Sequence, residues 1–402
     1  MRLPCPAKEK YMKTLLIILM VIIIAVSAVI FITKPPSPPK KVGDINELET
    51  YFGELVKSNV PPGLSIVITK NDNVVYAKSY GMADGDNQIP ANMDTVYHWW
   101  SMTKVPTSIA IMQLQEKGLL DINDPVEKYL PFFQVEYEKA PVHEITIRQL
   151  LSHTSGLPDT VPAILGWVHY ENIIYNQTEL VERYLEDYSQ LRYAPGSASS
   201  YSNFGYMVLG AVIETVSGQS YEEYVVEHIL TPANMSQTNF LYTDSMQEHE
   251  AMGSHPLVSM YTPMLPFLLD MKPLVLKQEG KILWFNRLYL DVTPSSGLIG
   301  STNDVGELMK NLLTSEILLS EESKSAMLPT GNLPGERPLG WAEYELDERP
   351  WVQHQGGGPG FATIMRLYPE ENLGIAILAN GTHLEGGKLV ELLAGLDWRE
   401  NR

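Results

Sequence analysis

The sequence predicts an α+β fold, in which an antiparallel sheet is flanked by helices and interrupted by an inserted helical subdomain. Two β-rich runs lie near the start of the body and four near its end, whereas the segment between them is mostly helical in pattern. Strands this far apart along the chain can complete one sheet, since layers pack to bury their apolar faces. We expect a sheet subdomain of about 44–90 and 290–402, and a helical subdomain of about 91–289.

The front of the body is predicted to form a helix and a hairpin. Asp44 with Glu47 three residues later resembles an N-terminal capping pair, and apolar residues then recur at helical spacing. Two runs rich in β-branched and aromatic residues follow at 64–69 and 74–80. The polar tripeptide 71–73 between them is a hairpin signal.

The middle of the body is predicted to contain helices at about 101–117 and 203–217, each followed by a glycine that can end it. Pro106 should distort or shorten the first turn of the first helix, because proline lacks an N–H. A third helix is expected after Ser220, whose partner Glu223 completes a capping box.

The last part of the body returns to strands and closes with a helix at about 384–398. The predicted strands span about 339–346, 351–355, 361–368 and 373–378.

Composition excludes several classes of function. The chain has 402 residues and one cysteine, so an internal disulfide and a cysteine-based zinc cluster are excluded. Its 29 Lys and Arg stand against 48 Asp and Glu, a net charge of −19. Binding to a phosphate backbone needs clustered cations, so nucleic acid is not an expected partner. No metal and no cofactor are predicted, and the pattern leaves the oligomeric state open.

The charge divides the chain unevenly. Through residue 41, seven cations stand against one acid, a balance of +6, which leaves −25 for the rest. An uncharged, mostly apolar run at 14–33 lies between a basic segment at 1–13 and a proline-rich spacer at 34–43. Twenty helical residues cover about 30 Å, the thickness of a bilayer's hydrocarbon core. We therefore predict a transmembrane helix at 14–33, a spacer, and a folded domain at 44–402.

A cleaved secretory signal is the alternative for this apolar run. The run is longer than the usual apolar stretch of about 7 to 15 residues, which favours an uncleaved anchor. Cations on the N-terminal side narrowly outnumber those on the other. We therefore expect a single-pass protein of the cell membrane, with its N-terminus inside and its folded domain on the extracytoplasmic side.

Ser101-Met-Thr-Lys104 places a hydroxyl and an amine three residues apart, on one helix face. A serine needs a nearby base to become a nucleophile, and a lysine shielded from water can serve. Free N–H groups at the helix start, including that of Ser101, can bind an oxyanion. A second Ser-x-x-Lys, at 37–40, contains two prolines that forbid the helix this chemistry needs.

Two further motifs carry suitable chemistry. Tyr201-Ser-Asn203 follows a loop of small residues, so the phenol can pass a proton and the amide can meet a substrate amide or Lys104. His354-Gln-Gly356 and the glycines after it join two strands. Glycines there let a ligand approach the backbone, and a strand-edge N–H can be a second oxyanion donor. For the histidine alone, a place at the rim of a glycine-rich hairpin is the alternative.

In this order, the three motifs resemble the serine β-lactamase superfamily, in its class C, DD-peptidase and carboxylesterase branch, and the resemblance covers most of the body. Other stretches are similar to that family: Ile111-Met-Gln-Leu114, Gly118-Leu-Leu-Asp121 with Asp124-Pro-Val126, Leu150-Leu-Ser-His-Thr-Ser-Gly-Leu157, Tyr206-Met-Val-Leu-Gly210, Ser296-Gly-Leu-Ile-Gly-Ser-Thr302 with Asp304, and Gly340-Trp341.

The resemblance implies a β-lactamase/transpeptidase-like fold and a covalent acyl-serine mechanism. Ser101 would attack, Lys104 and Tyr201 would manage the protons, and Asn203 would orient the acyl amide. The N–H groups of Ser101 and Gly357 would hold the oxyanion.

One position departs from that pattern. His354 stands where penicillin-recognising members have a lysine, in their K-T-G motif, beside the substrate carboxylate. A histidine is mostly uncharged near neutral pH unless its pKa is raised. The departure argues against efficient β-lactam hydrolysis and favours esters or peptides.

Rival sites are weaker. No G-x-S-x-G elbow occurs. His153 is a conceivable base, but the resemblance treats its segment as scaffold. Trp99 and Trp100 are either an apolar wall for an acyl group or core. The apolar stretch 256–276 is buried core, a lid or a membrane-touching patch.

The sequence thus predicts a membrane-anchored serine hydrolase acting on a small-molecule or cell-wall peptide substrate, with Ser101, Lys104, Tyr201, Asn203 and His354 in one cleft. The rival hypothesis is a non-catalytic, penicillin-binding receptor that is acylated at the same serine and turns over negligibly.

Overall fold

The computed structural model describes residues 35–85, 87–158, 167–259, 262, 265–328 and 337–398. The predicted basic segment 1–13 and the predicted span 14–33 lie outside these ranges. Within the ranges, none of the helices combines the length and apolar character needed to cross a bilayer.

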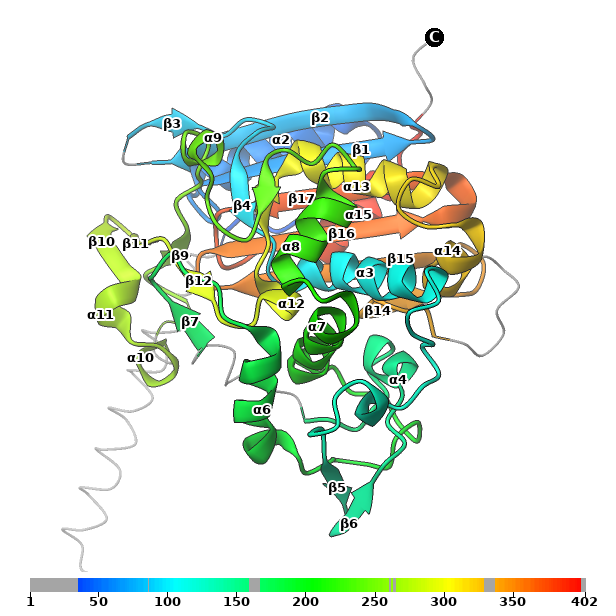
Figure 1. Cartoon of the computed structure of the whole chain (residues 1–402). Coiled ribbons are helices and arrows are strands. Elements are labelled where there is room, and N and C mark those ends of the chain that lie inside the picture. Colours follow the sequence, from blue (N-terminus) through cyan, green and yellow to red (C-terminus); the bar gives the residue numbers. More distant parts are fainter. Residues whose placement is uncertain are drawn as a thin grey trace, which may run out of the picture.

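A seven-stranded antiparallel sheet unites the two ends of the body, as the sequence predicts (Figure 1). Its order is β14-β15-β16-β17-β1-β2-β3, so β17 and β1, which are far apart in sequence, pair side by side with Leu64 opposite Ala379. The strands are β1 (Gly63–Lys70), β2 (Asn73–Asp84), β3 (Ile89–Pro90), β14 (Glu343–Glu345), β15 (Trp351–Gly358), β16 (Phe361–Tyr368) and β17 (Leu373–Ala379).

Helices cover both faces of this sheet. The helices α2 (Ile45–Lys57) and α15 (Gly386–Ala394) pack on one face, over alternate β1 residues such as Leu64, Ile66 and Ile68. On the other face, α13 (Thr302–Thr314) packs over β1 and β17. Side chains alternate across a strand, so β1 supplies apolar residues to both cores.

The segment between the sheet halves is mainly helical, with short strands at its margins (Figure 1). Its helices are α3 (Lys104–Glu116), α4 (Ile147–Leu151), α6 (Gln177–Tyr188), α7 (Asn203–Ser217), α8 (Tyr221–Val225), α9 (Asp244–Gln247), α10 (Leu265–Leu268), α11 (Met271–Leu274) and α12 (Thr293–Ser296), and α14 (Glu321–Met327) follows α13. Its strands are β4 (Val96–His98), β5 (Val135–Tyr137), β6 (Ala140–Val142), β7 (Val168–His169), β8 (Thr238–Asn239), β9 (Ser254–Pro256), β10 (Val275–Glu279), β11 (Ile282–Phe285), β12 (Tyr289–Leu290) and β13 (Ile299–Ser301).

The predicted caps are confirmed. Asp44 accepts from the N–H groups of Asn46 and Glu47 at the start of α2. The helix α7 ends at Gly218, whose φ of 74° is the left-handed conformation that glycine adopts without strain. Ser220 begins α8 with the full capping box.

Several boundaries differ from the prediction; β2 and β15, for example, extend beyond the expected 74–80 and 351–355. The helix expected from residue 101 starts as a 3-10 turn, η1 (Trp100–Thr103), and becomes α-helical only at Lys104, as Pro106 two residues later favours. The strand expected from 339 shortens to β14, because Leu339 and Gly340 donate their N–H groups to Ala326 and Leu151 instead. The closing helix ends at Ala394, before Gly395.

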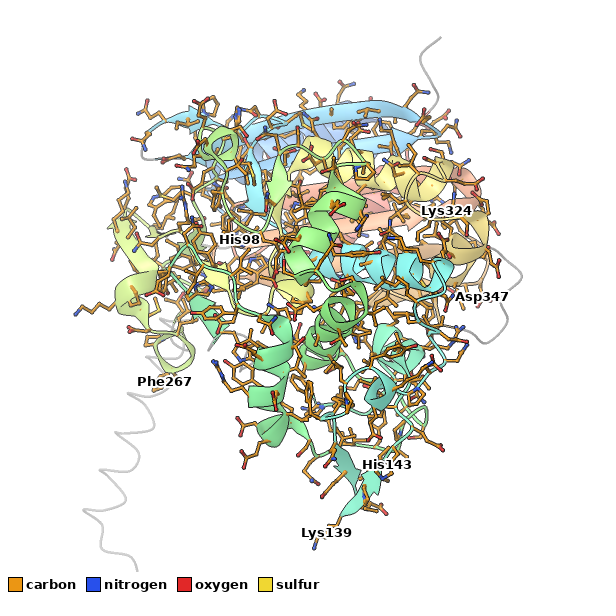
Figure 2. All side chains as sticks on the ribbon, viewed as in Figure 1. His98, Lys139, His143, Phe267, Lys324 and Asp347 are labelled. Carbon is orange, nitrogen blue, oxygen red and sulfur yellow. The ribbon has the colours of Figure 1, made fainter. Side chains whose placement is uncertain are left out.

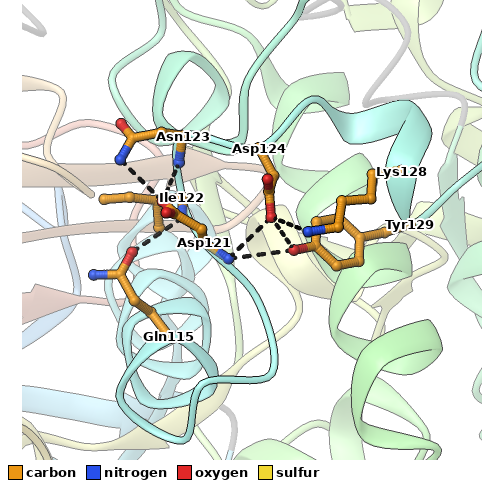
Figure 3. Close-up of polar contacts among 7 residues, drawn as sticks. All are labelled: Gln115, Asp121, Ile122, Asn123, Asp124, Lys128 and Tyr129. Carbon is orange, nitrogen blue, oxygen red and sulfur yellow. Dashed lines mark hydrogen bonds and ion pairs between the residues drawn. The ribbon is translucent and has the colours of Figure 1, made fainter.

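The loop after α3 is held by side-chain hydrogen bonds (Figure 3). The carboxylate of Asp124 accepts from the Tyr129 hydroxyl at 2.5 Å and from Lys128 Nζ at 2.6 Å. Gln115, on the last turn of α3, accepts from the N–H of Ile122 at 3.0 Å. The bonds of Asp124 hold the loop together, and the bond of Gln115 ties the loop to the last turn of the helix that carries Lys104.

Among the described residues of the apolar stretch 256–276, some side chains are buried and others are exposed. Leu274 is buried, whereas Phe267 is 88% exposed and points away from the body (Figure 2). Core packing therefore explains only part of this stretch.

Candidate active site

Ser101 lies in η1, a turn that contacts β15 and β16 of the sheet and the helices α3 and α12. Trp99 and Trp100, directly before it, are buried, so they are core residues. The Trp99 carbonyl accepts from the Met102 N–H at 3.2 Å and from the Thr363 hydroxyl of β16 at 3.0 Å. The turn carrying Ser101 is thus tied to the sheet.

Lys104 is fully buried and its amine meets three oxygens. Nζ lies 3.2 Å from Ser101 Oγ, 2.8 Å from Asn203 Oδ1 and 2.7 Å from the Ser295 carbonyl oxygen. Asn203, the first residue of α7, and Ser295, the third of α12, therefore meet the serine at the amine of Lys104, the first residue of α3. Asn203 contacts Lys104, one of the two partners that the sequence left open.

Tyr201 reaches the same lysine through its ring. The ring centroid lies 4.9 Å from Lys104 Nζ, and that of Tyr206 lies 5.5 Å away. The ring of Tyr201 also lies 6.1 Å from that of His354, centroid to centroid. Ser202 caps α7 by accepting from the Gly205 N–H, which fixes the chain immediately after the tyrosine.

His354 is buried in β15, beside these groups. Its Nδ1 lies 2.9 Å from the carbonyl oxygen of Gln355, which can only accept, so Nδ1 carries the proton. Burial, and then the positive charge of Lys104, lower the pKa of His354 to about 3. The imidazole is therefore neutral at physiological pH, and it supplies no cation in place of a lysine.

The glycines after His354 let β15 lie against η1. A Cβ on Gly356 would stand 2.0 Å from the Trp99 carbonyl oxygen, and one on Gly358 would stand 2.4 Å from the Trp100 ring. Gly357 is exposed, and a Cβ there would meet nothing within 4 Å.

The register directs the Gly357 N–H outward from the sheet. Successive residues of a strand point their N–H groups to opposite neighbouring strands. Because the N–H of Asn380 donates to Gly63 of β1, the N–H of Ala379 points to β16. Bonded and non-bonded pairs alternate in antiparallel sheets, so Ala362, opposite Ala379, turns its N–H away from β15. Gly357, opposite Ala362, therefore points its own N–H away from β16. That direction suits an oxyanion donor.

Two contributors were missed by sequence reasoning. The Ser295 carbonyl is a main-chain group, which no side-chain motif reveals. His153, treated as scaffold, lies with its ring 4.5 Å from that of Tyr201. The only sequence signal for His153 was its place in the Leu-Ser-His-Thr stretch that resembles the family. Among the residues that the structure describes, no group of three or more His, Cys, Asp or Glu could hold a metal ion.

Comparison with known proteins finds matches over most of the chain. A family model described as Beta-lactamase matches residues 48–395. Protein flp of Staphylococcus aureus (strain MW2) is 30% identical over 86% of this chain, and the match spans 65% of that protein, just under two thirds. Penicillin-binding protein 4* of Bacillus subtilis (strain 168) is 28% identical over 83% of this chain and 71% of its own length.

A solved structure has the same fold. The octameric penicillin-binding protein homologue from Pyrococcus abyssi superposes with a TM-score of 0.70 and is 27% identical. The superposition covers 89% of this chain and 78% of that one.

Proposed function

This chain belongs to the beta-lactamase family, within the superfamily of serine hydrolases, and on that premise we propose that it is an acyl-serine hydrolase with Ser101 as its nucleophile. The observation that carries the proposal is the convergence of Ser101, Asn203 and the Ser295 carbonyl on one buried amine.

Acylation begins with the amine of Lys104 in its neutral form. Its two N–H groups then satisfy the Asn203 and Ser295 oxygens, because both are acceptors, and its lone pair faces Ser101 Oγ at 3.2 Å. The lone pair takes the hydroxyl proton as Oγ attacks the carbonyl carbon of the substrate. The N–H groups of Ser101 and Gly357 stabilise the oxyanion that forms.

The proton then has to reach the leaving group. Tyr201, whose ring lies beside Lys104, passes it to the departing oxygen or nitrogen, which leaves an acyl-serine. Water, activated by the same pair of residues, hydrolyses the acyl-serine and restores Ser101.

The substrate class follows from charge. His354 is neutral and buried, so its position offers no ammonium to a substrate carboxylate. Esters, and peptides or amides that place no carboxylate next to His354, fit this site better than β-lactams. The carboxylate of a β-lactam is best bound by a cation. We propose a small ester or a cell-wall peptide as substrate.

The experiment compares two serines in the same sequence pattern. The wild type, Ser101→Ala and Ser37→Ala are incubated with a p-nitrophenyl ester and with a fluorescent penicillin. Ser37 begins the other Ser-x-x-Lys and lies exposed in the spacer, so it is the matched control. Steady ester turnover that Ser101→Ala abolishes and Ser37→Ala retains is expected.

The alternative is a receptor that is acylated once and turns over negligibly. It predicts stoichiometric labelling of Ser101 without turnover. Absence of both turnover and a Ser101 adduct would contradict the hydrolase and the receptor together.

A further inference from the structure

His153 holds both residues that flank Tyr201. The N–H of Ser200 donates to the His153 carbonyl oxygen at 3.0 Å, and the N–H of Ser202 donates to His153 Nδ1 at 3.2 Å. The ring of His153 lies 4.5 Å from that of Tyr201, inclined by 33°. One residue thus fixes the chain on both sides of the tyrosine and packs against its ring.

The contacts also fix the chemical form of His153. Nδ1 accepts a hydrogen bond, so the proton of the neutral ring is on Nε2. The ring is buried, and burial followed by the charge of Lys104 lowers the pKa of His153 well below its usual value. A neutral ring can pack on the phenol without placing a cation beside the amine of Lys104.

His153 is itself held by the end of α4 and by Tyr193, which lies earlier in the segment that carries Tyr201. It follows α4 with a φ of 56°, and its N–H donates to Leu150. The hydroxyl of Tyr193 donates to its carbonyl at 3.3 Å. A residue with an unusual backbone conformation persists only where its surroundings define it, and such residues gather at functional sites.

We propose that His153 is a positioning residue, which holds Tyr201 where it exchanges a proton with Lys104 and the leaving group. The inference rests on the hydrolase proposed above. His153 does not touch substrate; it acts through Tyr201, by the bond to Ser202 and by the ring contact.

Two substitutions separate those contributions. His153→Asn keeps a short-range acceptor for the Ser202 N–H and removes the ring, whereas His153→Phe keeps a ring and removes the acceptor. His143→Phe is the matched control, since His143 is an exposed histidine near the β5–β6 hairpin, paired with Glu127 (Figure 2). Each variant is assayed for ester hydrolysis and for thermal unfolding.

We expect His153→Phe to lower kcat about 10- to 100-fold with little change in KM, since a displacement near 1 Å has that scale of effect. His153→Asn should lose less, and His143→Phe nothing. The decisive measurement is the double variant. In the Tyr201→Phe background, adding His153→Phe should cause no further loss in kcat, because the hydroxyl that His153 positions is already absent.

Multiplicative losses in the double variant would overturn the inference, as would a wild-type kcat in His153→Phe. If His153→Phe does not fold, the same cycle with His153→Asn decides. Retained hydrolysis in Ser101→Ala would instead contradict the proposed function, so the two failures are distinguishable.

Discussion

His354 is fully buried in β15, beside Lys104 and Tyr201. The motif located it beside the serine, and its chemistry predicted a mostly neutral ring unless the pKa was raised. The structure agrees with a neutral ring, because burial and Lys104 both lower the pKa of His354. Burial depends on the packing of β15 against η1, which no local pattern displays.

The glycines of β15 provide a prediction with an internal control. Gly356→Ala should lower the free energy of unfolding by about 1–3 kcal/mol, because its Cβ would overlap the Trp99 carbonyl and the Thr363 hydroxyl. Gly357→Ala, one residue later, should change it by less than about 0.5 kcal/mol, since nothing lies near its Cβ. Urea unfolding measures the free energy of unfolding of both variants. Equal losses of stability would mean that β15 does not pack closely against η1 at Gly356.

At the scale of elements, α12 depends on two neighbours. Gly210 of α7 lets Pro294 approach, since a Cβ there would stand 2.1 Å from the proline ring. The buried carboxyl of Glu222 in α8 accepts from the hydroxyl of Thr293, at the start of α12. These contacts hold the short helix whose Ser295 carbonyl meets Lys104.

Glu222 gives this arrangement a pH dependence. Burial raises its pKa from 4.5 to about 7, so the folded state binds a proton that the unfolded state releases. The stabilisation is fully present below pH 4.5 and is lost as pH rises through about 7. Relative to Glu222→Gln, the wild type should lose about 2 kcal/mol of unfolding free energy between pH 5 and pH 8.

Urea unfolding at the two pH values measures that difference. Glu182→Gln, at an exposed position of α6, is the control and should follow the wild type at both. A wild-type curve parallel to that of Glu222→Gln would show that the carboxyl does not titrate in this window.

Elements with local signals were predictable and those without were not. Asp44, Gly218 and Ser220 marked their helix ends because capping is decided within a few residues. Pro106 indicated a distorted start of α3, but the first α-helical residue was not predictable, since the Trp99 contact with β16 shapes η1. The four-residue α12 is a product of tertiary packing and was not predicted.

The pairing of β17 with β1 joins strands from the two ends of the body into one sheet. The β-rich runs predicted strands at both ends of the body, and layer packing predicted one sheet. The register, with Leu64 opposite Ala379, determines that the Gly357 N–H points outward two strands away. The donor proposed for the oxyanion thus depends on residues from both ends of the body.

The predicted N-terminal anchor would determine where the folded domain lies relative to the membrane. We propose that residues 14–33 anchor the chain and that 34–43 space the body from the bilayer, because twenty uncharged, mostly apolar residues match about 30 Å of hydrocarbon. The spacer meets the body early: the Tyr51 hydroxyl donates to the Pro36 carbonyl at 3.2 Å. The enzyme would therefore work close to the membrane surface.

This anchoring can be separated from secretion by expressing the full chain beside residues 35–402. The full chain should sediment with membranes after an alkaline carbonate wash and keep its N-terminal segment by mass, whereas residues 35–402 should stay in the supernatant. Protease added to intact cells should digest the body, since it is expected outside. A full-length gene product that appears in the supernatant, shortened within the apolar run, would show instead that the segment is a cleaved signal.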